Sequence, residues 1–302
     1  MTSTYRPRRI AQSLFIEARG LRHHVRCWGE PDAPLLVMVH GWMDISASFQ
    51  FVVDCFSRDY RVIAPDWRGF GLSSRPQADC YWYPDYLADL DALLDALLPG
   101  RKIDLVGHSM GGSIAMQYAG VRPERIRRLI NLEGLGMAKS QPGEAPARMR
   151  EWLDELRKGS RLRDYGSRLR DYASQEEVAQ RLVKTNHRLP IDKARWLSGL
   201  WSERTPDGRY ALLGDPAHKV SNPSPYRVDE VVATWREITA PVLLVNAADD
   251  GSRLRLIRSR EFGERLMAIR DLRQMQVEDA GHMLHHDQPE KVASLIEEFM
   301  HG

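Results

Sequence analysis

The sequence contains few cysteines. Cys27, Cys55 and Cys80 are the only three in 302 residues, and no pair of them has the C-x-x-C spacing. An odd number of cysteines with these spacings argues against a disulfide framework and against a cysteine-based zinc site. Free thiols are typical of a reducing compartment, so we expect a cytoplasmic protein.

Long apolar runs and a strong net charge are also missing. No apolar stretch has the length needed to cross a bilayer, and the basic first ten residues lack the apolar core of a signal peptide. The 43 basic and 41 acidic side chains leave a formal net charge of +2, which argues against a nucleic-acid-binding protein. We therefore expect neither a membrane nor a nucleic acid as partner. The sequence leaves open whether the protein is a monomer or a homodimer.

The hydrophobic residues, 43% of the chain, gather in short runs that alternate with helical patterns. Residues 13–17 and 23–28 alternate in polarity around Arg19-Gly20 and predict a hairpin. Two further runs, Leu35–Val39 and Arg61–Ala64, are typical of strands buried on both faces. Four more runs also predict strands: Ile103–Val106, Arg128–Leu132, Pro241–Val245 and Leu272–Val277. This alternation predicts an α/β protein with a doubly wound, mostly parallel sheet. The first 12 residues are predicted to be a loose arm.

The buried-strand pattern stops between about residues 138 and 235. This segment is helical in pattern and rich in arginine, and its one hairpin candidate turns on Asp207-Gly208. We therefore predict a mostly helical cap, residues 138–235, inserted after the sixth strand of a core domain formed by residues 1–137 and 236–302. A cap at this position would cover the strand ends where open α/β sheets bind ligands.

The most informative motif is Gly107-His108-Ser109-Met110-Gly111. It follows a strand pattern and opens a helical one, which is the context of a G-x-S-x-G nucleophile elbow. A nucleophile at this turn must project from the backbone, and the flanking glycines allow the helix to pass close to the strand. Ser109 is therefore the candidate nucleophile, and the amide of Met110 points to where an oxyanion would form.

A serine nucleophile of this kind needs a base and an acid, in the chain order Ser, acid, His. His282 follows a glycine just after the last strand, so it is the candidate general base. His285 and His286 are weaker alternatives because they lie nearer the next helix. The strand ending at Val245 leads to Asp249 and Asp250, where a carboxylate can orient an imidazole.

Together these motifs resemble those of the α/β-hydrolase-fold serine hydrolases over roughly residues 13–300. The resemblance includes His40-Gly41-Trp42 and the stretch Asp66–Gly71, and residues 40–49 are similar to the serine-hydrolase-like (kraken-type) branch. It implies that the amides of Trp42 and Met110 form the oxyanion hole, and that His40, Asp66 and Arg68 hold loops beside the site. It also implies a fold that needs no metal and no organic cofactor.

The identity of the acid stays open between three carboxylates. The family's G-x-x-D turn corresponds to Ala247-Ala-Asp-Asp250, which selects Asp250 over the adjacent Asp249. Some relatives use a carboxylate at the end of the preceding strand, where this chain has Glu133. Glu133 can therefore be the acid itself, a partner of the site or a charge that holds the cap.

The catalytic set Ser109, Asp250 and His282 predicts acyl transfer through an acyl-enzyme. A carboxylesterase for small to medium acyl substrates is the leading expectation. Lactones, thioesters and carbon–carbon bonds beside a carbonyl, as in meta-cleavage hydrolases, are alternatives. Epoxide hydrolases and haloalkane dehalogenases carry Asp at the elbow, so the serine argues against both. A non-catalytic ligand-binding protein of the same fold is disfavoured, because it would not need all three residues.

Overall fold

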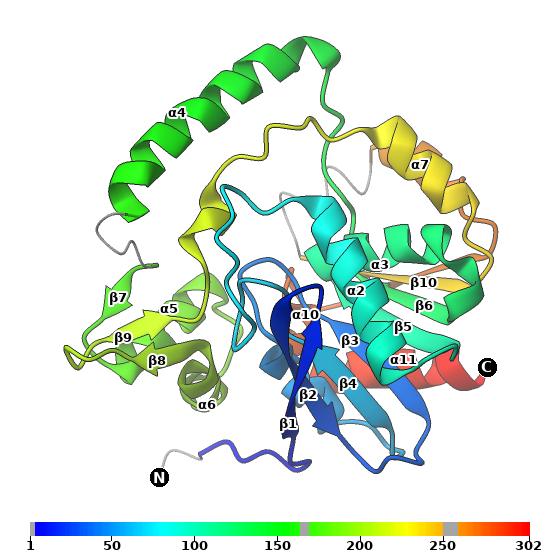
Figure 1. Ribbon diagram of the computed structural model, residues 1–302. Coiled ribbons are helices and arrows are strands. Elements are labelled where there is room, and N and C mark those ends of the chain that lie inside the picture. Colours follow the sequence, from blue (N-terminus) through cyan, green and yellow to red (C-terminus); the bar gives the residue numbers. More distant parts are fainter. Residues whose placement is uncertain (1–3, 164–168, 250–258) are drawn as a thin grey trace.

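The computed structural model describes residues 4–163, 169–249 and 259–302. Its centre is an eight-stranded sheet in the order β1-β2-β4-β3-β5-β6-β10-β11 (Figure 1). In chain order the strands are β1 (Gln12–Ala18), β2 (Leu21–Trp28), β3 (Leu35–Val39), β4 (Arg61–Pro65), β5 (Ile103–His108), β6 (Ile126–Leu132), β10 (Val242–Ala247) and β11 (Leu272–Val277).

The sheet is parallel except at one edge. β1 and β2 form an antiparallel hairpin, and β2 pairs antiparallel with β4. The other neighbours pair in parallel. After β4 the chain passes back across β3 to form β5 on its other side. Because β3, β5, β6 and β10 are parallel neighbours, their carboxyl ends meet at one edge. The predicted doubly wound, mostly parallel sheet is confirmed.

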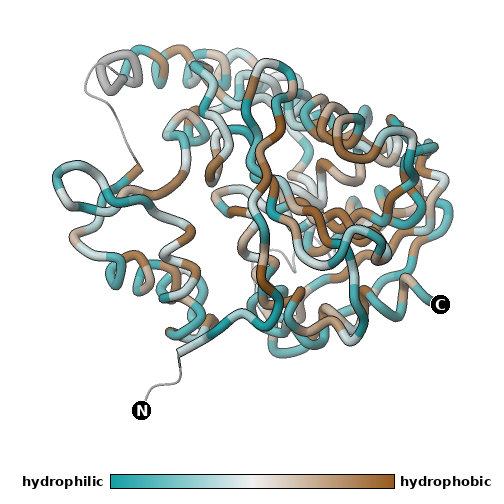
Figure 2. Tube along the Cα trace, turned by 60° about the horizontal axis from the view of Figure 1, so that its bottom comes forward, coloured by the Kyte–Doolittle hydropathy of each residue, from teal (hydrophilic) through white to brown (hydrophobic). Residues whose placement is uncertain are grey.

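Helices cover both faces of this sheet. One face carries α2 (Tyr83–Leu97), α3 (Met110–Val121) and α7 (Val228–Arg236), and the other carries α1 (Gln50–Val53), α10 (Leu284–Asp287) and α11 (Pro289–His301). Alternate residues of β3 serve the two cores: Val37 and Val39 pack on the first side, Leu36 and Met38 on the second. Figure 2 shows hydrophobic residues gathered along these strands. No helix in the described parts of the chain has the length and apolarity that crossing a membrane requires.

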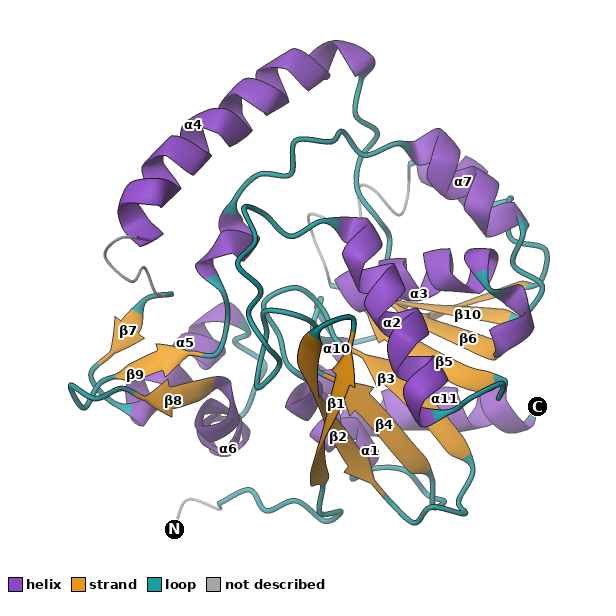
Figure 3. Ribbon diagram, viewed as in Figure 1, coloured by secondary structure: helices purple, strands orange, loops and turns teal. Residues whose placement is uncertain are grey.

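The chain between β6 and β10 forms the inserted segment. Its elements are α4 (Ala145–Arg163), β7 (Asp171–Tyr172), α5 (Gln175–Thr185), α6 (Ile191–Trp201), β8 (Ser202–Arg204), β9 (Tyr210–Leu212) and α7. The short strands make a separate sheet in the order β7-β9-β8, well away from the main sheet in Figure 3. The hairpin expected around Asp207-Gly208 is present as β8 and β9. The predicted cap boundary at residue 235 falls within α7, which packs against α3.

Short helical turns complete the described connections. They are the 3-10 helices η1 (Ser46–Phe49), η2 (Pro123–Arg125), η3 (Pro142–Glu144) and η4 (Pro216–Lys219), and α9 (Arg260–Leu266) lies between β10 and β11.

The N-terminal arm, residues 4–11, is tied to the body rather than loose as predicted. The carboxylate of Asp54 accepts hydrogen bonds from the Tyr5 hydroxyl (2.5 Å) and from the backbone amides of Arg8 and Arg9 (3.0 Å each). The Tyr5 ring also packs edge-on against Trp196 of the inserted segment, at 5.3 Å between centroids. The arm therefore bridges the core and the inserted segment, a long-range contact that its polar, proline-containing sequence does not reveal.

Candidate active site

Ser109 lies at the turn between β5 and α3. Its backbone angles are φ 53° and ψ −115°, a region that non-glycine residues rarely occupy and that costs energy to hold. Its amide donates to the Leu132 carbonyl of the neighbouring strand, at 2.8 Å. The turn has the strained geometry expected of a nucleophile elbow.

The flanking glycines are required by close backbone packing. A Cβ on Gly107 would lie 2.5 Å from the carbonyl oxygen of Gly111, and a Cβ on Gly111 would overlap the carbonyl oxygen of Val39. No real Cβ makes such contacts, so both positions need glycine. The sequence predicted that these glycines let the helix pass close to a strand, and the structure shows this close approach at both positions.

His282 follows β11 and faces Ser109. Its Nε2 lies 2.9 Å from the Ser109 hydroxyl oxygen, which is hydrogen-bond distance. Two contacts hold its loop: His108 Nε2 donates to the His282 carbonyl at 2.8 Å, and the Gly281 amide donates to Asp287 at 2.8 Å. The two residues that the sequence selected as nucleophile and base, 173 positions apart, are thus brought together.

Among the residues that the structure describes, Glu133 is the one whose carboxylate lies beside His282. It ends β6, has φ 59° and is fully buried. Its Oε2 lies 3.5 Å from His282 Nδ1, and its Oε1 accepts from the Ala247 amide at 2.6 Å. Glu133 therefore approaches the imidazole and also fixes the end of β10.

Asp249 is the one of the two adjacent aspartates that the structure describes. Asp249 is half-exposed, and its Oδ2 accepts from Arg188 of the inserted segment at 2.8 Å. Its side chain therefore serves a contact with that segment. Asp250, the predicted acid, lies outside the described residues. Of the three candidate histidines, His282 is the one that lies at Ser109. His285 and His286 lie in α10 and are buried.

The predicted oxyanion donors lie on either side of the serine. Met110 is the first residue of α3, where backbone amides have no partner within the helix. Trp42 follows Gly41, whose backbone is so close that a Cβ there would lie 3.2 Å from the Ser109 Cβ. The Trp42 side chain is half-exposed.

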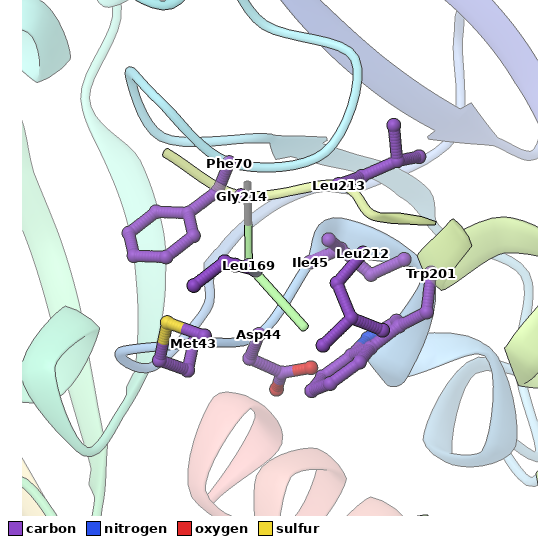
Figure 4. Close-up of a pocket in the computed structure, with 9 residues that line it drawn as sticks. All are labelled: Met43, Asp44, Ile45, Phe70, Leu169, Trp201, Leu212, Leu213 and Gly214. Carbon is purple, nitrogen blue, oxygen red and sulfur yellow. The ribbon is translucent and has the colours of Figure 1, made fainter. Parts of the chain in front are cut away.

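A narrow pocket lies between the loop after β3 and the inserted segment (Figure 4). It is lined mostly by apolar side chains from both parts of the chain: Met43, Asp44, Ile45, Phe70, Leu169, Trp201, Leu212 and Leu213, together with Gly214. Met43 adjoins Trp42 in the chain. Asp44 is the one carboxylate among the residues that line this pocket.

A family model for the alpha/beta hydrolase fold matches residues 34–289. The chain belongs to this family. A serine hydrolase-like protein of Danio rerio is 27% identical to this hydrolase over 282 residues, which cover 90% of this chain and 83% of that protein. A 2-hydroxy-6-oxo-2,4-heptadienoate hydrolase of Pseudomonas putida is 39% identical over 106 residues, 34% of this chain and 38% of that enzyme. The solved thioesterase domain from the curacin biosynthetic pathway superposes with a TM-score of 0.81 at 25% identity, covering 96% of this chain and 99% of the domain.

The loop residues of this α/β hydrolase have the positions that the resemblance implied. His40 Nε2 accepts from the Trp67 amide at 3.0 Å, and Arg68 makes a bidentate ion pair with Asp89. Burial alone would raise the pKa of Asp66, but hydrogen bonds from His24 and from the Ser46 amide, with the nearby imidazoles, hold it below its usual value. These contacts fix the loops that follow β3 and β4.

The sequence did not single out His108. The signal for it was its place inside the elbow motif, one residue before the candidate nucleophile, but its partner could be identified only after the sheet order was known. Glu133 was one of three candidate acids, and its carboxylate lies 3.5 Å from His282 Nδ1.

Proposed function

We propose that this α/β hydrolase is a serine hydrolase that works through an acyl-enzyme, and that its preferred reaction is hydrolysis of small to medium carboxylic esters. The observation that carries the proposal is the 2.9 Å separation of His282 Nε2 and the Ser109 hydroxyl oxygen at a strained elbow. A hydroxyl at this distance from an imidazole can transfer its proton as it attacks a carbonyl. We expect the protein to be cytoplasmic and to act on a small acyl substrate.

In the proposed reaction Ser109 attacks the acyl carbonyl and His282 Nε2 takes its proton. The amides of Trp42 and Met110 donate to the oxyanion, a contribution of roughly 3 kcal/mol per donor in related sites. His282 then protonates the leaving alkoxide as the carbon–oxygen bond breaks. Water, deprotonated by the same imidazole, hydrolyses the acyl-enzyme and returns Ser109 to its starting state.

We propose Asp250 as the acid that orients His282, with Glu133 as a second carboxylate at the same imidazole. The distance from Glu133 Oε2 to His282 Nδ1, 3.5 Å, is the outer limit of a hydrogen bond, and the other oxygen of Glu133 is engaged by Ala247. β6 and β10 are neighbours in the parallel sheet. Glu133 and the residues that follow β10 therefore leave the sheet at the same edge, where both can approach His282.

We also propose that residues 138–235 include the cap that selects the acyl group. Contact between this segment and the loop after β3 supports this, because the apolar side chains of Leu169, Trp201 and Leu212 lie near Met43 around the small space of Figure 4, which is itself too small for an acyl chain. The half-exposed Trp42 adds further apolar surface at this position. An apolar wall of this kind favours acyl chains over charged groups.

A carbon–carbon hydrolase is the second candidate. The match to the 2-hydroxy-6-oxo-2,4-heptadienoate hydrolase favours it, because 39% of 106 positions are identical. A thioesterase would use the same proposed steps with a thiolate as leaving group. Substrate selection separates these activities, since the nucleophile and base are common to all of them.

Two measurements test the proposal. A fluorophosphonate probe, followed by mass spectrometry, should add one phosphonyl group at Ser109. A set of p-nitrophenyl esters of graded chain length, run beside thioesters, lactones and ring-cleavage dienoates, should show the highest kcat/KM for an ester. Labelling without turnover of any ester would support one of the alternatives, and a folded protein that is neither labelled nor active would overturn the proposal.

A further inference from the structure

A second group of chemically active side chains is buried behind the site. Asp44, from the loop after β3, lies beside His285 and His286 at the start of α10, and one ligating atom from each lies within 4.8 Å of the others. All three are buried, with exposures of 4%, 0% and 3%. The Asp44 Oδ2 to His285 Nε2 distance is 3.8 Å, and the two imidazole centroids are 4.3 Å apart.

The polar atoms of this group are poorly satisfied within the described part of the chain. Asp44 Oδ2, both ring nitrogens of His285 and Nε2 of His286 have no hydrogen-bond partner there. Buried polar atoms normally have one, and leaving several unpaired in one place is costly. Such a concentration of orphaned polar atoms indicates a missing ligand.

Other contacts prepare the side chains for coordination. The Ser48 hydroxyl donates to the second oxygen of Asp44, and the backbone of Ser48 is hydrogen-bonded to the His286 ring. A buried imidazole and a carboxylate whose other atoms are hydrogen-bonded are typical of metal ligands with their supporting partners.

We propose that Asp44, His285 and His286 bind one divalent transition-metal ion, with Zn²⁺ as the best match. Two imidazole nitrogens and one carboxylate oxygen form a common three-residue zinc set, and Zn²⁺ accepts them at roughly 2.0–2.2 Å. Ligand atoms around such an ion lie roughly 3.4 Å apart. The ligand atoms, which lie within 4.8 Å of one another, would therefore have to draw together by up to about 1.4 Å.

The pocket of Figure 4 supplies a fourth position and a route of entry. Asp44 lines it, and Figure 4 shows the carboxylate directed toward Trp201. Its free volume, about 10 Å³, matches a single water molecule. A metal-bound water can therefore occupy this space and complete a tetrahedral shell.

The proposed ion would hold α10 in place against the loop after β3. The His285 ring faces the His108 ring at 4.2 Å between centroids, and His108 holds the carbonyl of His282. The metal ligands begin three residues after His282. Binding would thus join the loop after β3 to α10 and stabilise the folded protein. This role does not depend on the proposed ester hydrolysis.

Titration of metal-free protein with Zn²⁺ tests the site directly. We expect binding of one ion per chain and a thermal midpoint that rises with zinc concentration, since a ligand of the native state shifts the unfolding equilibrium. His286→Gln should weaken binding about a hundred-fold or more. Exposed His187 provides the matched control, because His187→Gln should leave the affinity unchanged, and His282→Gln should do so as well.

X-ray absorption of the Zn²⁺-loaded wild-type protein keeps the test independent of how the buried variants fold. It should show two imidazoles and light oxygen ligands. A wild-type protein that binds no Zn²⁺ stoichiometrically would overturn the site. So would a folded His286→Gln variant with wild-type affinity, a loss of binding in His282→Gln, or a spectrum with fewer than two imidazoles.

Discussion

The hydroxyl of Ser109 depends on its neighbours for both its position and its chemistry. The turn holds the residue at φ 53°, and His282 Nε2 lies 2.9 Å from the oxygen. Replacing the hydroxyl removes the proposed nucleophile but leaves the backbone contacts of the elbow intact. A substitution at Ser109 can therefore test activity without disturbing the fold.

We expect Ser109→Ala to fold normally and to lose ester turnover by about a million-fold, as other triads do. Steady-state kinetics and circular dichroism measure the two effects. Ser113→Ala, four residues along α3, is the matched control and should retain activity. Turnover close to wild type in Ser109→Ala would contradict the assignment.

The proposed acid Asp250 and the described carboxylate Glu133 make a second prediction at this scale. Asp250→Asn should reduce kcat by about four orders of magnitude, because the imidazole loses the acid that fixes its tautomer and balances its charge. Glu133→Gln should cost much less, since an amide oxygen can still accept from the Ala247 amide. Asp249→Asn should cost least.

If Glu133→Gln is the more damaging change, the acid is on β6. Measuring kcat and the thermal midpoint together distinguishes this outcome from a loss of folding, because Glu133 also holds the end of β10.

At the scale of elements, the fit of β5 against α3 leaves no room for side chains at the crossing. Gly107 faces a backbone oxygen, which cannot move aside as a flexible side chain would. The helix thus packs on its own strand at backbone contact distance, and the sharp turn at Ser109 is a consequence.

We expect Gly107→Ala to destabilise the protein by roughly 3 kcal/mol through overpacking. Gly263→Ala is the control, because a Cβ there meets nothing within 4 Å and lies in helix α9. It should be neutral or stabilising by roughly 0.5–1 kcal/mol. Chemical denaturation measures both. A Gly107→Ala variant as stable as wild type would contradict so close a crossing of strand and helix.

Element η4 inserts His218 between two aromatic rings of the core. The imidazole stacks on Phe70 at 3.7 Å and on Tyr81 at 3.6 Å between centroids. Burial lowers the pKa of His218 from 6.5 to about 3. The native state therefore binds its proton much more weakly than the unfolded chain does.

This difference predicts acid sensitivity. The contribution of neutral His218 to stability is complete above pH 6.5 and is lost as the pH falls toward 3, because the unfolded state takes up the proton first. Between pH 7 and pH 4.5 the loss is roughly 2–3 kcal/mol. His218→Phe should reduce this loss in denaturant titrations, whereas His301→Gln at the exposed C-terminus should not. If the free energy of unfolding of His218→Phe depended on pH as it does in the wild type, the lowered pKa of His218 would be contradicted.

The sequence predicted the sheet, the elbow and the serine–histidine pair because each has a local signature. Strand runs such as Leu35–Val39 alternate between two buried faces, and Gly107 and Gly111 reflect contacts within one turn. The partners of Glu133, His108 and Tyr5 could not be predicted in this way. Each of them meets residues more than 100 positions away, and strand order or docking of the inserted segment decides the contact.

The proposed metal site shows the same limit. The sequence predicted no metal ligands, because it has no C-x-x-C pair and the adjacent His285 and His286 gave no indication of a third ligand as distant as Asp44. Asp44 and His285 are more than 200 positions apart. The crossing of the loop after β3 over α10 brings them together.

For the molecule as a whole, a few polar contacts join the inserted segment to the loop of His282. Asn186 donates to Asp287 at 2.7 Å, and the other oxygen of Asp287 accepts from the Gly281 amide. Arg188 reaches Asp249 from the same stretch. Movement of the inserted segment is thus coupled to the residue before His282.

We expect Asn186→Ala to increase amide hydrogen exchange in residues 281–288, because Asp287 loses one of its two partners. The effect on global stability should be about 1 kcal/mol, the usual net value of one hydrogen bond. Arg195→Ala is the control, since it breaks an exposed ion pair with Glu176 inside the inserted segment. Equal exchange in the two variants would show that this link does not restrain the loop.

The contact of Tyr5 with Trp196 has a consequence for synthesis of the chain. The arm leaves the ribosome before its aromatic partner, which is made 191 residues later. Translation at about 5–20 residues per second separates the two events by roughly 10–40 seconds. During that interval the arm has no completed docking surface, and a chaperone can reach the whole Tyr5 ring. Docking then covers part of that ring against Trp196.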